Sequence, residues 1–238
     1  MKILAIDTSA VAAGCAVCED GVVLAESFLN RKLTHSQTIL PMAEDMLKNC
    51  QLSLKKIDAF AGAAGPGSLT GLRMGISAVK AMAFAAEKPA AGVSTLLALA
   101  YNLVGTRGII CPAMDARCGQ VYTAVFRGTE TSLERLIEDE AVPVEQIFSQ
   151  LEEISRAEKL PVWFVGDGAE LCFRRWESER PEFDAFLAPA ARRFAHASSA
   201  ALAAEQQKEL FRPAVELNPV YLRLPQAERE YQAKLQQK

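Results

Sequence analysis

The chain has 238 residues, half of them hydrophobic, and a formal net charge of −3. This length suits one large domain or two of about 110 residues. The acidic balance argues against a chain that binds nucleic acid by itself, because such binding depends on neutralising phosphates. No segment approaches the roughly 20 apolar residues of a membrane span, and Asp7 comes too early for a signal peptide. We therefore expect a cytoplasmic protein, without membrane association, whose six cysteines are free thiols.

The first 28 residues read as a three-stranded meander, with strands predicted at 3–6, 13–18 and 22–28. Cys15 and Cys18 have the spacing of redox and zinc sites. Because strand residues three apart point to opposite faces, we interpret this spacing as accidental. Only two histidines occur, His35 and His196, so a helical pair of histidine metal ligands is impossible and no metal site is expected.

A helix is predicted from about Thr34, where Thr34 and Gln37 fit a capping box. Pro41 should kink this helix or delay its regular part. A strand near 58–64 then leads into the glycine-rich run from Gly65 to Arg73, a position where α/β proteins often hold phosphates.

The glycine-rich run fails the known phosphate-binding patterns. Ser68 and Leu69 stand where a P-loop requires lysine and a hydroxyl residue, and Gly71 comes one residue too late for a dinucleotide fingerprint. Pro66 removes an N–H group from the loop. Two interpretations remain: a weak anion site with donors from Ser68, Thr70 and Arg73, or, favoured, a helix start capped by Ser68 or Thr70.

The helix predicted to run on to about Ala86 is apolar most of the way round. One stripe is large and apolar, and the adjacent faces carry small residues and methionines, in particular Gly71, Met74, Gly75, Ala78 and Met82. Such a helix is either central to its own domain or meets another chain. A short strand around Val93 and a helix over 95–103 complete this half.

The second half repeats the order of the first. Strands are predicted at 109–114, 120–126 and 132–137, followed by a helix over 144–156 and a strand at 162–165. Asp115 takes the place of Asp7 at the end of the first strand, so we infer a duplicated β-β-β-α-β-α unit. A last helix is predicted at 194–208, before a segment over 213–223 and a polar, mobile tail.

Two such halves are the plan of the actin-like ATPase and sugar-kinase superfamily, in which the first-strand Asp meets metal-bound phosphates. Here the turn at Asp7 lacks the glycine of that pattern, and Arg117 puts a bulky cation after Asp115. We therefore interpret the nucleotide cleft as degenerate. Its residues are Asp7, Thr8, Ser9, Ser68, Thr70, Arg73 and Asp115.

Several segments resemble the bacterial TsaB (YeaZ) family over nearly the whole chain. They are the first strand with its turn at 3–9, His35-Ser36-Gln37, the run 65–75, Met114-Asp115-Ala116-Arg117 and Pro219-Val220-Tyr221-Leu222-Arg223. The resemblance implies an α/β fold of two duplicated ribonuclease H-like halves, each a mixed sheet flanked by helices. The expected domains are 1–106 joined by about 192–224, a smaller half at 107–191, and the tail at 225–238.

The same resemblance implies a subunit without catalytic residues. TsaB proteins pair with the related subunit TsaD and, with TsaE, support formation of N6-threonylcarbamoyladenosine at adenosine 37 of tRNA. The helices after the meander and after the glycine run would contact TsaD and can also support a homodimer, while tRNA would be contacted mainly through the partner. The expected contact residues are Ile39, Met42, Met46, Gly71, Met74, Gly75, Ala78 and Met82.

The methionines give this surface independent support, because four of the six fall on these two helices and flexible thioethers suit repacking against partners. The alternative is that they fill gaps in the protein's own core.

Two enzymatic alternatives also remain. A small-molecule kinase or ATPase of the superfamily would bind ATP in dependence on Asp7, whereas we expect no firm cofactor and no nucleotide on this chain alone. A stand-alone peptidase would need His35 or His196 as its base, and no nucleophile-elbow motif occurs.

Overall fold

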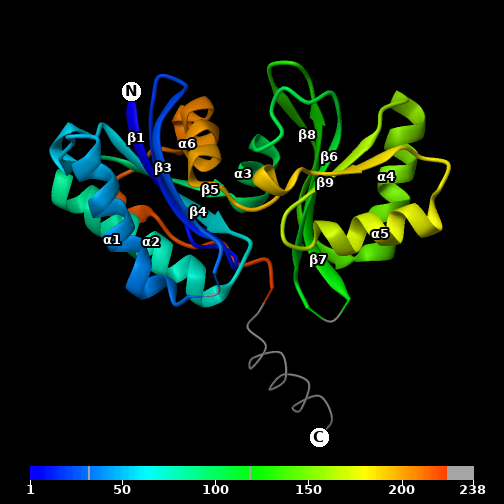
Figure 1. The fold of residues 1–238 in the computed structure, drawn as a ribbon, viewed down its shortest axis with the longest axis horizontal. Helices are drawn as coiled ribbons and strands as arrows, with labels where there is room; N and C mark the ends of the chain where they lie inside the picture. The colour runs from blue at the N-terminus through cyan, green and yellow to red at the C-terminus, as the bar shows by residue number, and fades with distance from the viewer. Residues whose placement is uncertain (32, 118, 224–238) are drawn as a thin grey trace, which may run out of the picture.

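The computed structural model describes residues 1–31, 33–117 and 119–223. The chain forms two similar halves side by side (Figure 1). The predicted tail at 225–238 lies outside the described residues. In the part of the chain that is described, no helix combines the length and apolarity needed to cross a membrane.

The first half is built on a five-stranded sheet with the order β3-β2-β1-β4-β5. Strand β1 pairs antiparallel with β2 and parallel with β4, as the meander and the following crossover require. The elements are β1 (Lys2–Asp7), β2 (Ala13–Glu19), β3 (Val22–Leu29), α1 (His35–Asn49), β4 (Ala59–Gly65), α2 (Leu69–Ala86), β5 (Ala90–Ser94) and α3 (Thr95–Tyr101), with a short 3₁₀ turn at Leu54–Lys56.

The second half repeats this topology, with the strand order β10-β9-β6-β7-β8. Its elements are β6 (Gly108–Asp115), β7 (Gln120–Gly128), β8 (Leu133–Pro143), α4 (Val144–Glu158), β9 (Val162–Val165), α5 (Ala169–Glu179) and β10 (Ala185–Leu187). The predicted duplication is confirmed, with Asp7 and Asp115 ending equivalent strands. Strand β8 ends six residues later than predicted, and the three-residue β10 carries too little pattern to be recognised in the sequence.

The elements stack in five layers, visible across Figure 1 from α1 and α2 to α4 and α5. Helices α1 and α2 cover the outer face of the first sheet, and α4 and α5 cover that of the second. Between the sheets lie α3 and α6 (Ala197–Gln206), whose apolar side chains join strands of both halves in one core. Cys15 and Cys18 lie in different clusters on opposite faces of β2, which confirms that their spacing is accidental.

Of the two capping predictions, the one for α2 is confirmed and the one for α1 is wrong. Ser68 is the N-cap of α2 and its hydroxyl accepts from the Gly71 N–H at 3.3 Å, as predicted. The capping box at Thr34 was wrong, because the Thr34 side chain makes no capping hydrogen bond. Helix α1 runs through Pro41, and α6 is shorter than the predicted 194–208.

After α6 the chain returns to the first half. It passes 3₁₀ turns at Lys208–Leu210 and Ala214–Glu216, and Arg212 exchanges backbone hydrogen bonds with Ala90. A further 3₁₀ turn at Ala190–Arg192 precedes α6. Helix α6 itself contacts β1, β2 and β4 of the first sheet. The domain limits at 106 and 191 stay predictions.

Candidate functional site

The turn after β1 is buried and satisfies most of its own polar groups. Asp7 is 1% exposed, and its Oδ1 accepts from the Ser9 N–H at 2.8 Å and the Ser9 hydroxyl at 2.6 Å. Burial raises the pKa of the Asp7 carboxyl, although the bonds from Ser9 oppose this. Asp7 Oδ2 is buried without a hydrogen-bond partner among the described residues.

The glycine-rich run packs directly onto this turn. The Thr8 hydroxyl donates to the Gly71 carbonyl at 2.7 Å, and the Ser68 N–H donates to the Ser9 carbonyl at 2.7 Å. A Cβ on Gly67 would lie 2.5 Å from the Ser9 carbonyl oxygen, and one on Gly71 would lie 2.1 Å from that of Thr8. These glycines therefore permit close approach of two backbones, and one N–H of the supposed phosphate cradle is already used.

Across the cleft, the turn after β6 is more open. The exposed Asp115 accepts from the Arg117 N–H at 2.8 Å and lies 3.5 Å from the Arg117 guanidinium. Asp167, two residues after β9, accepts from the Asp115 N–H at 3.3 Å. Loss of surrounding water raises the pKa of Asp167, and the charge of Asp115 adds to this.

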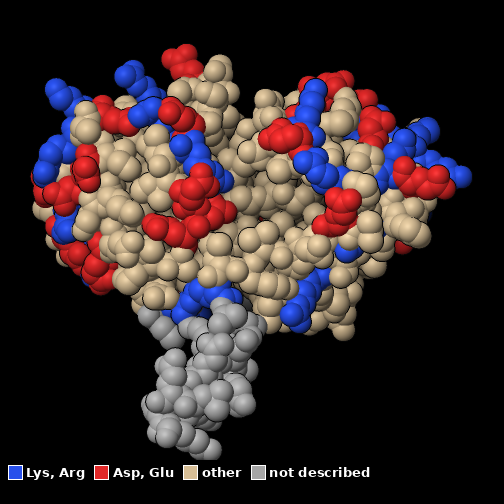
Figure 2. Space-filling view, turned by 180° about the vertical axis from the view of Figure 1, so that it is seen from behind, with Lys and Arg blue, Asp and Glu red and all other residues tan. Residues whose placement is uncertain are grey.

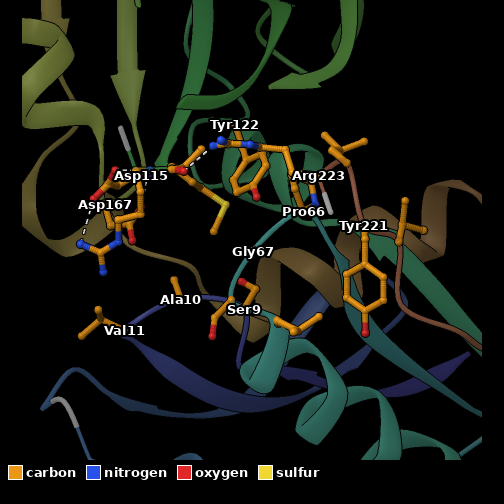
Figure 3. A pocket seen from close by; sticks show the side chains of 17 residues that line it. Ser9, Ala10, Val11, Pro66, Gly67, Asp115, Tyr122, Asp167, Tyr221 and Arg223 are labelled. Atoms are coloured by element: carbon orange, nitrogen blue, oxygen red, sulfur yellow. Dashed lines mark hydrogen bonds and ion pairs between the residues drawn. The ribbon is translucent and has the colours of Figure 1, made fainter. Parts of the chain in front are cut away.

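A cleft of about 430 Å³ separates the two turns (Figure 3). Ser9, Ser68 and Asp115 line it, whereas Thr70 and Arg73 lie on the other side of α2. The predicted anion site is thus only partly brought together, and among the described residues its lining holds no lysine to reach a phosphate.

The segment Pro219–Arg223, here called the strap, lines the cleft through its last four residues. The Val220 N–H donates to the Ala64 carbonyl at 2.7 Å, and Arg223 donates to the Ala116 carbonyl, a contact drawn in Figure 3. The strap therefore joins β4 to the turn after β6. Sequence reasoning quoted this motif but gave it no role, and it also missed Tyr122 and Asp167 in the cleft lining.

A second hollow, here called the groove, lies between α1 and α2. Its volume is about 530 Å³, and its lining is mostly apolar or small. The lining residues are Ser36, Ile39, Leu40, Thr70, Arg73, Met74, Ser77, Ala78 and Ala81. Leu40 is 52% exposed, although it is a large apolar residue on a helix surface.

Several predicted contact residues are buried in the protein's own packing. Met46 and Met82 are 5% and 8% exposed and belong to the core under α1 and α2. Met46 also accepts from the Cys15 thiol at 3.9 Å, so it fills a gap beside the sheet. Gly71 and Gly75 face Thr8, since a Cβ on Gly75 would lie 2.4 Å from the Thr8 hydroxyl oxygen.

Met46, Met82, Gly71 and Gly75 are thus used in internal packing, and their predicted role as partner contacts stays a prediction. Of the remaining predicted residues, Ile39, Met74 and Ala78 line the groove, and Met42 is half-buried beside the core. Ile39 and Ala78 also belong to that core and form the floor of the groove, so Met74 is the most exposed of the three. The small face of α2 was open to two interpretations in the sequence, because periodicity does not say what a helix face packs against.

Both histidines make structural contacts. His35 Nε2 lies 2.8 Å from the Ala10 carbonyl oxygen, and His196 Nδ1 lies 3.2 Å from Glu26 Oε2. The His196 ring also stacks on Phe28. Neither contacts a serine hydroxyl within the described residues, and no group of three His, Cys, Asp or Glu there could hold a metal ion.

Comparisons with known proteins agree with this geometry. A family model described as tRNA N6-adenosine threonylcarbamoyltransferase (TsaD) matches residues 22–234. The tRNA threonylcarbamoyladenosine biosynthesis protein TsaB of Bacillus subtilis is 35% identical over 171 residues, 72% of this chain and 73% of that protein. The Escherichia coli TsaB is 42% identical over 144 residues, 60% of this chain and 62% of that protein.

The solved structure of YeaZ from Pseudomonas aeruginosa is 27% identical, with a TM-score of 0.75 over 93% of this chain and 99% of that one. The topology defines a duplicated α/β protein with an actin-like fold, whose two halves are separated by a cleft that Asp115 lines, while Asp7 is buried beside it. Within that class, the chain belongs to the TsaB (YeaZ) family.

Proposed function

We propose that this chain is a non-catalytic scaffold subunit in the formation of N6-threonylcarbamoyladenosine at adenosine 37 of tRNA, acting by pairing with TsaD. The observation that carries the proposal is that two faces of helix α2 have different surroundings. Its glycine face is used against the turn at Thr8, while its other face forms an open apolar groove with α1.

The cleft supports a role without catalysis. A phosphotransfer site needs donors and cations placed around the phosphates, whereas here the Ser68 N–H already bonds Ser9, and Arg223 of the strap is bonded to the Ala116 carbonyl. Asp7 is enclosed by its own turn. We therefore expect no cofactor on this chain alone.

The groove supports pairing with another protein. Exposed apolar side chains between two parallel-packed helices fit an apolar helix surface of a partner. TsaD would dock here directly, TsaE would join through the complex, and a second copy of the chain could occupy the same groove when TsaD is absent. Charges of both signs are interspersed over the face in Figure 2, which fits tRNA contact mainly through the partner. We place this assembly in the cytoplasm.

The test is reconstitution of tRNA modification from purified components. Threonylcarbamoyladenosine should form with this chain, TsaD, TsaE and the threonylcarbamoyl-adenylate synthase, and should fall to background when this chain is left out. The chain alone should show no transferase activity. Full activity without it would contradict the proposal.

Variants at the groove test whether TsaD binds there. Met74→Asp should abolish co-purification with TsaD while the circular dichroism spectrum stays unchanged, because Met74 lies half-exposed at the groove. Ala78→Asp should act likewise, but it is more buried and needs the same folding check. Leu171→Asp is the matched control, since Leu171 is an exposed apolar residue on α5 in the other half.

A second candidate, a small-molecule kinase or ATPase, is favoured by the buried, unpaired oxygen of Asp7 at the actin-like position. It requires micromolar binding of ATP with Mg²⁺ by the isolated chain, lost in Asp7→Asn. Titration calorimetry without a binding signal would exclude it.

A further inference from the structure

Arg73 is the charged residue of the groove lining. The other lining side chains are apolar, small or hydroxyl-bearing. Arg73 lies next to Met74, and Ser77 and Ala81 follow it one and two helical turns later along the exposed side of α2. A partner helix that covers the groove must therefore also cover, or lie against, one positive charge.

Arg73 has no carboxylate partner among the described residues, whereas arginines such as Arg127, Arg135 and Arg175 are each paired with acids. Its Nε donates to the Tyr221 hydroxyl at 3.0 Å, and its guanidinium carbon lies 5.8 Å from the centre of the Tyr221 ring. These contacts engage one of its five N–H donors, so most of its bonding capacity faces outward.

Tyr221 holds the guanidinium in place. The Tyr221 ring points toward α2 and away from Asp115 and Asp167 (Figure 3). Tyr221 is anchored in turn by the strap, through the Val220 N–H on Ala64 and Arg223 on Ala116. An arginine fixed in this way loses less side-chain freedom on binding, and its planar fork matches a carboxylate.

We infer that the partner helix seated in the groove carries an Asp or Glu that pairs with Arg73, so that Arg73 is a specificity-determining residue of the docking surface. The inference rests on the proposed function. If an apolar helix end covered Arg73, its guanidinium would lose water without gaining a partner, which would weaken binding. A carboxylate at that place accepts the guanidinium N–H groups and favours this partner, in this orientation, over others. The occupant is therefore a helix with an apolar face and an acid at the end that meets the start of α2.

The experiment measures the Kd of the chain for TsaD by titration calorimetry at about 50 and 300 mM salt. Arg73→Glu should weaken binding by about 30-fold or more at low salt, since a desolvated ion pair is lost and like charges meet. Arg73→Lys should fall between wild type and Arg73→Ala, because a lysine keeps the charge but not the fork. Tyr221→Phe, which keeps the ring, should weaken binding only severalfold.

Arg192→Glu is the control, because it makes the same charge change at an exposed position in the 3₁₀ turn before α6, outside the groove lining, and should stay within about twofold of wild type. Binding of Arg73→Glu at wild-type affinity, with Met74→Asp inactive, would overturn the carboxylate pairing but leave the groove as the docking site. Wild-type binding by both variants would overturn the docking site itself.

The experiment also distinguishes TsaD from a second copy of this chain as the occupant of the groove. If Arg73→Glu abolished self-association in sedimentation but left TsaD binding unchanged, the acid would belong to the second copy, and the inference about the catalytic partner would be wrong. Urea unfolding of each variant confirms that the fold is retained.

Discussion

Glu26 and His196 tie the start of α6 to the edge strand β3. The imidazole lies against one carboxylate oxygen, and the other oxygen accepts from the Ser198 N–H at 3.0 Å. The hydrogen bond with Glu26 raises the pKa of His196. Burial alone would raise the pKa of Glu26, but the bonds from His196 and Ser198 outweigh it and lower that pKa.

This pair makes stability depend on pH. The raised pKa of His196 means that its contribution is complete below the unfolded value of about 6.5 and is lost as pH rises through the folded value. The lowered pKa of Glu26 means that its contribution is present above about pH 4.5 and is lost as pH falls. His196→Gln should therefore reduce the free energy of unfolding more at pH 6 than at pH 8.5, measured by urea denaturation.

Glu26→Gln is the control for this prediction. With the carboxylate neutralised, the cost of His196→Gln should become nearly the same at both pH values. If His196→Gln cost the same at both pH values in the protein that keeps Glu26, His196 would instead act through its stacking on Phe28.

At the scale of single elements, α2 is held by backbone approach as well as by side chains. A glycine in a helix interior ordinarily costs about 1 kcal/mol relative to alanine. Gly71→Ala should nevertheless lower the free energy of unfolding by about 1–3 kcal/mol, because the new Cβ would lie 2.1 Å from the Thr8 carbonyl oxygen. Ser77→Ala, on the exposed side of the same helix, should change it by less than about 0.5 kcal/mol. A more stable Gly71→Ala protein would mean that α2 does not lie against Thr8.

The sequence was sufficient to predict most elements, because their periodicity and turn residues are local. It placed Asp7 and Asp115 at equivalent strand ends and Ser68 at the start of α2. It could not decide what the glycine face of α2 meets, since Thr8 and Gly71 are joined only by the fold. For the same reason it left open whether Met46 and Met82 fill the protein's own core, where they are largely buried, and it gave the strap no role.

At the scale of the whole molecule, the two halves share their central layer. The core around α3 and α6 contains Ile3 and Val93 of the first sheet and Ile110 and Phe126 of the second. The Asn102 amide also donates to the carbonyls of Arg192 and Phe194, which links α3 to the segment before α6. Neither half can expose its inner face without opening this layer, so the duplicated sequence does not imply two independent folding units.

We therefore expect a single cooperative unfolding transition in urea. Both tryptophans, Trp163 and Trp176, lie in the second half, so their fluorescence reports on that half, whereas far-ultraviolet circular dichroism reports on the whole chain. The two midpoints should coincide. The Gly71→Ala change, made in the first half, should shift the tryptophan transition and the dichroism transition equally, because loss of the first sheet uncovers the shared layer. The expectation would be contradicted if the two midpoints differed, or if Gly71→Ala left the tryptophan transition unshifted. Either result would show that the second half keeps its structure when α6 no longer packs on the first sheet.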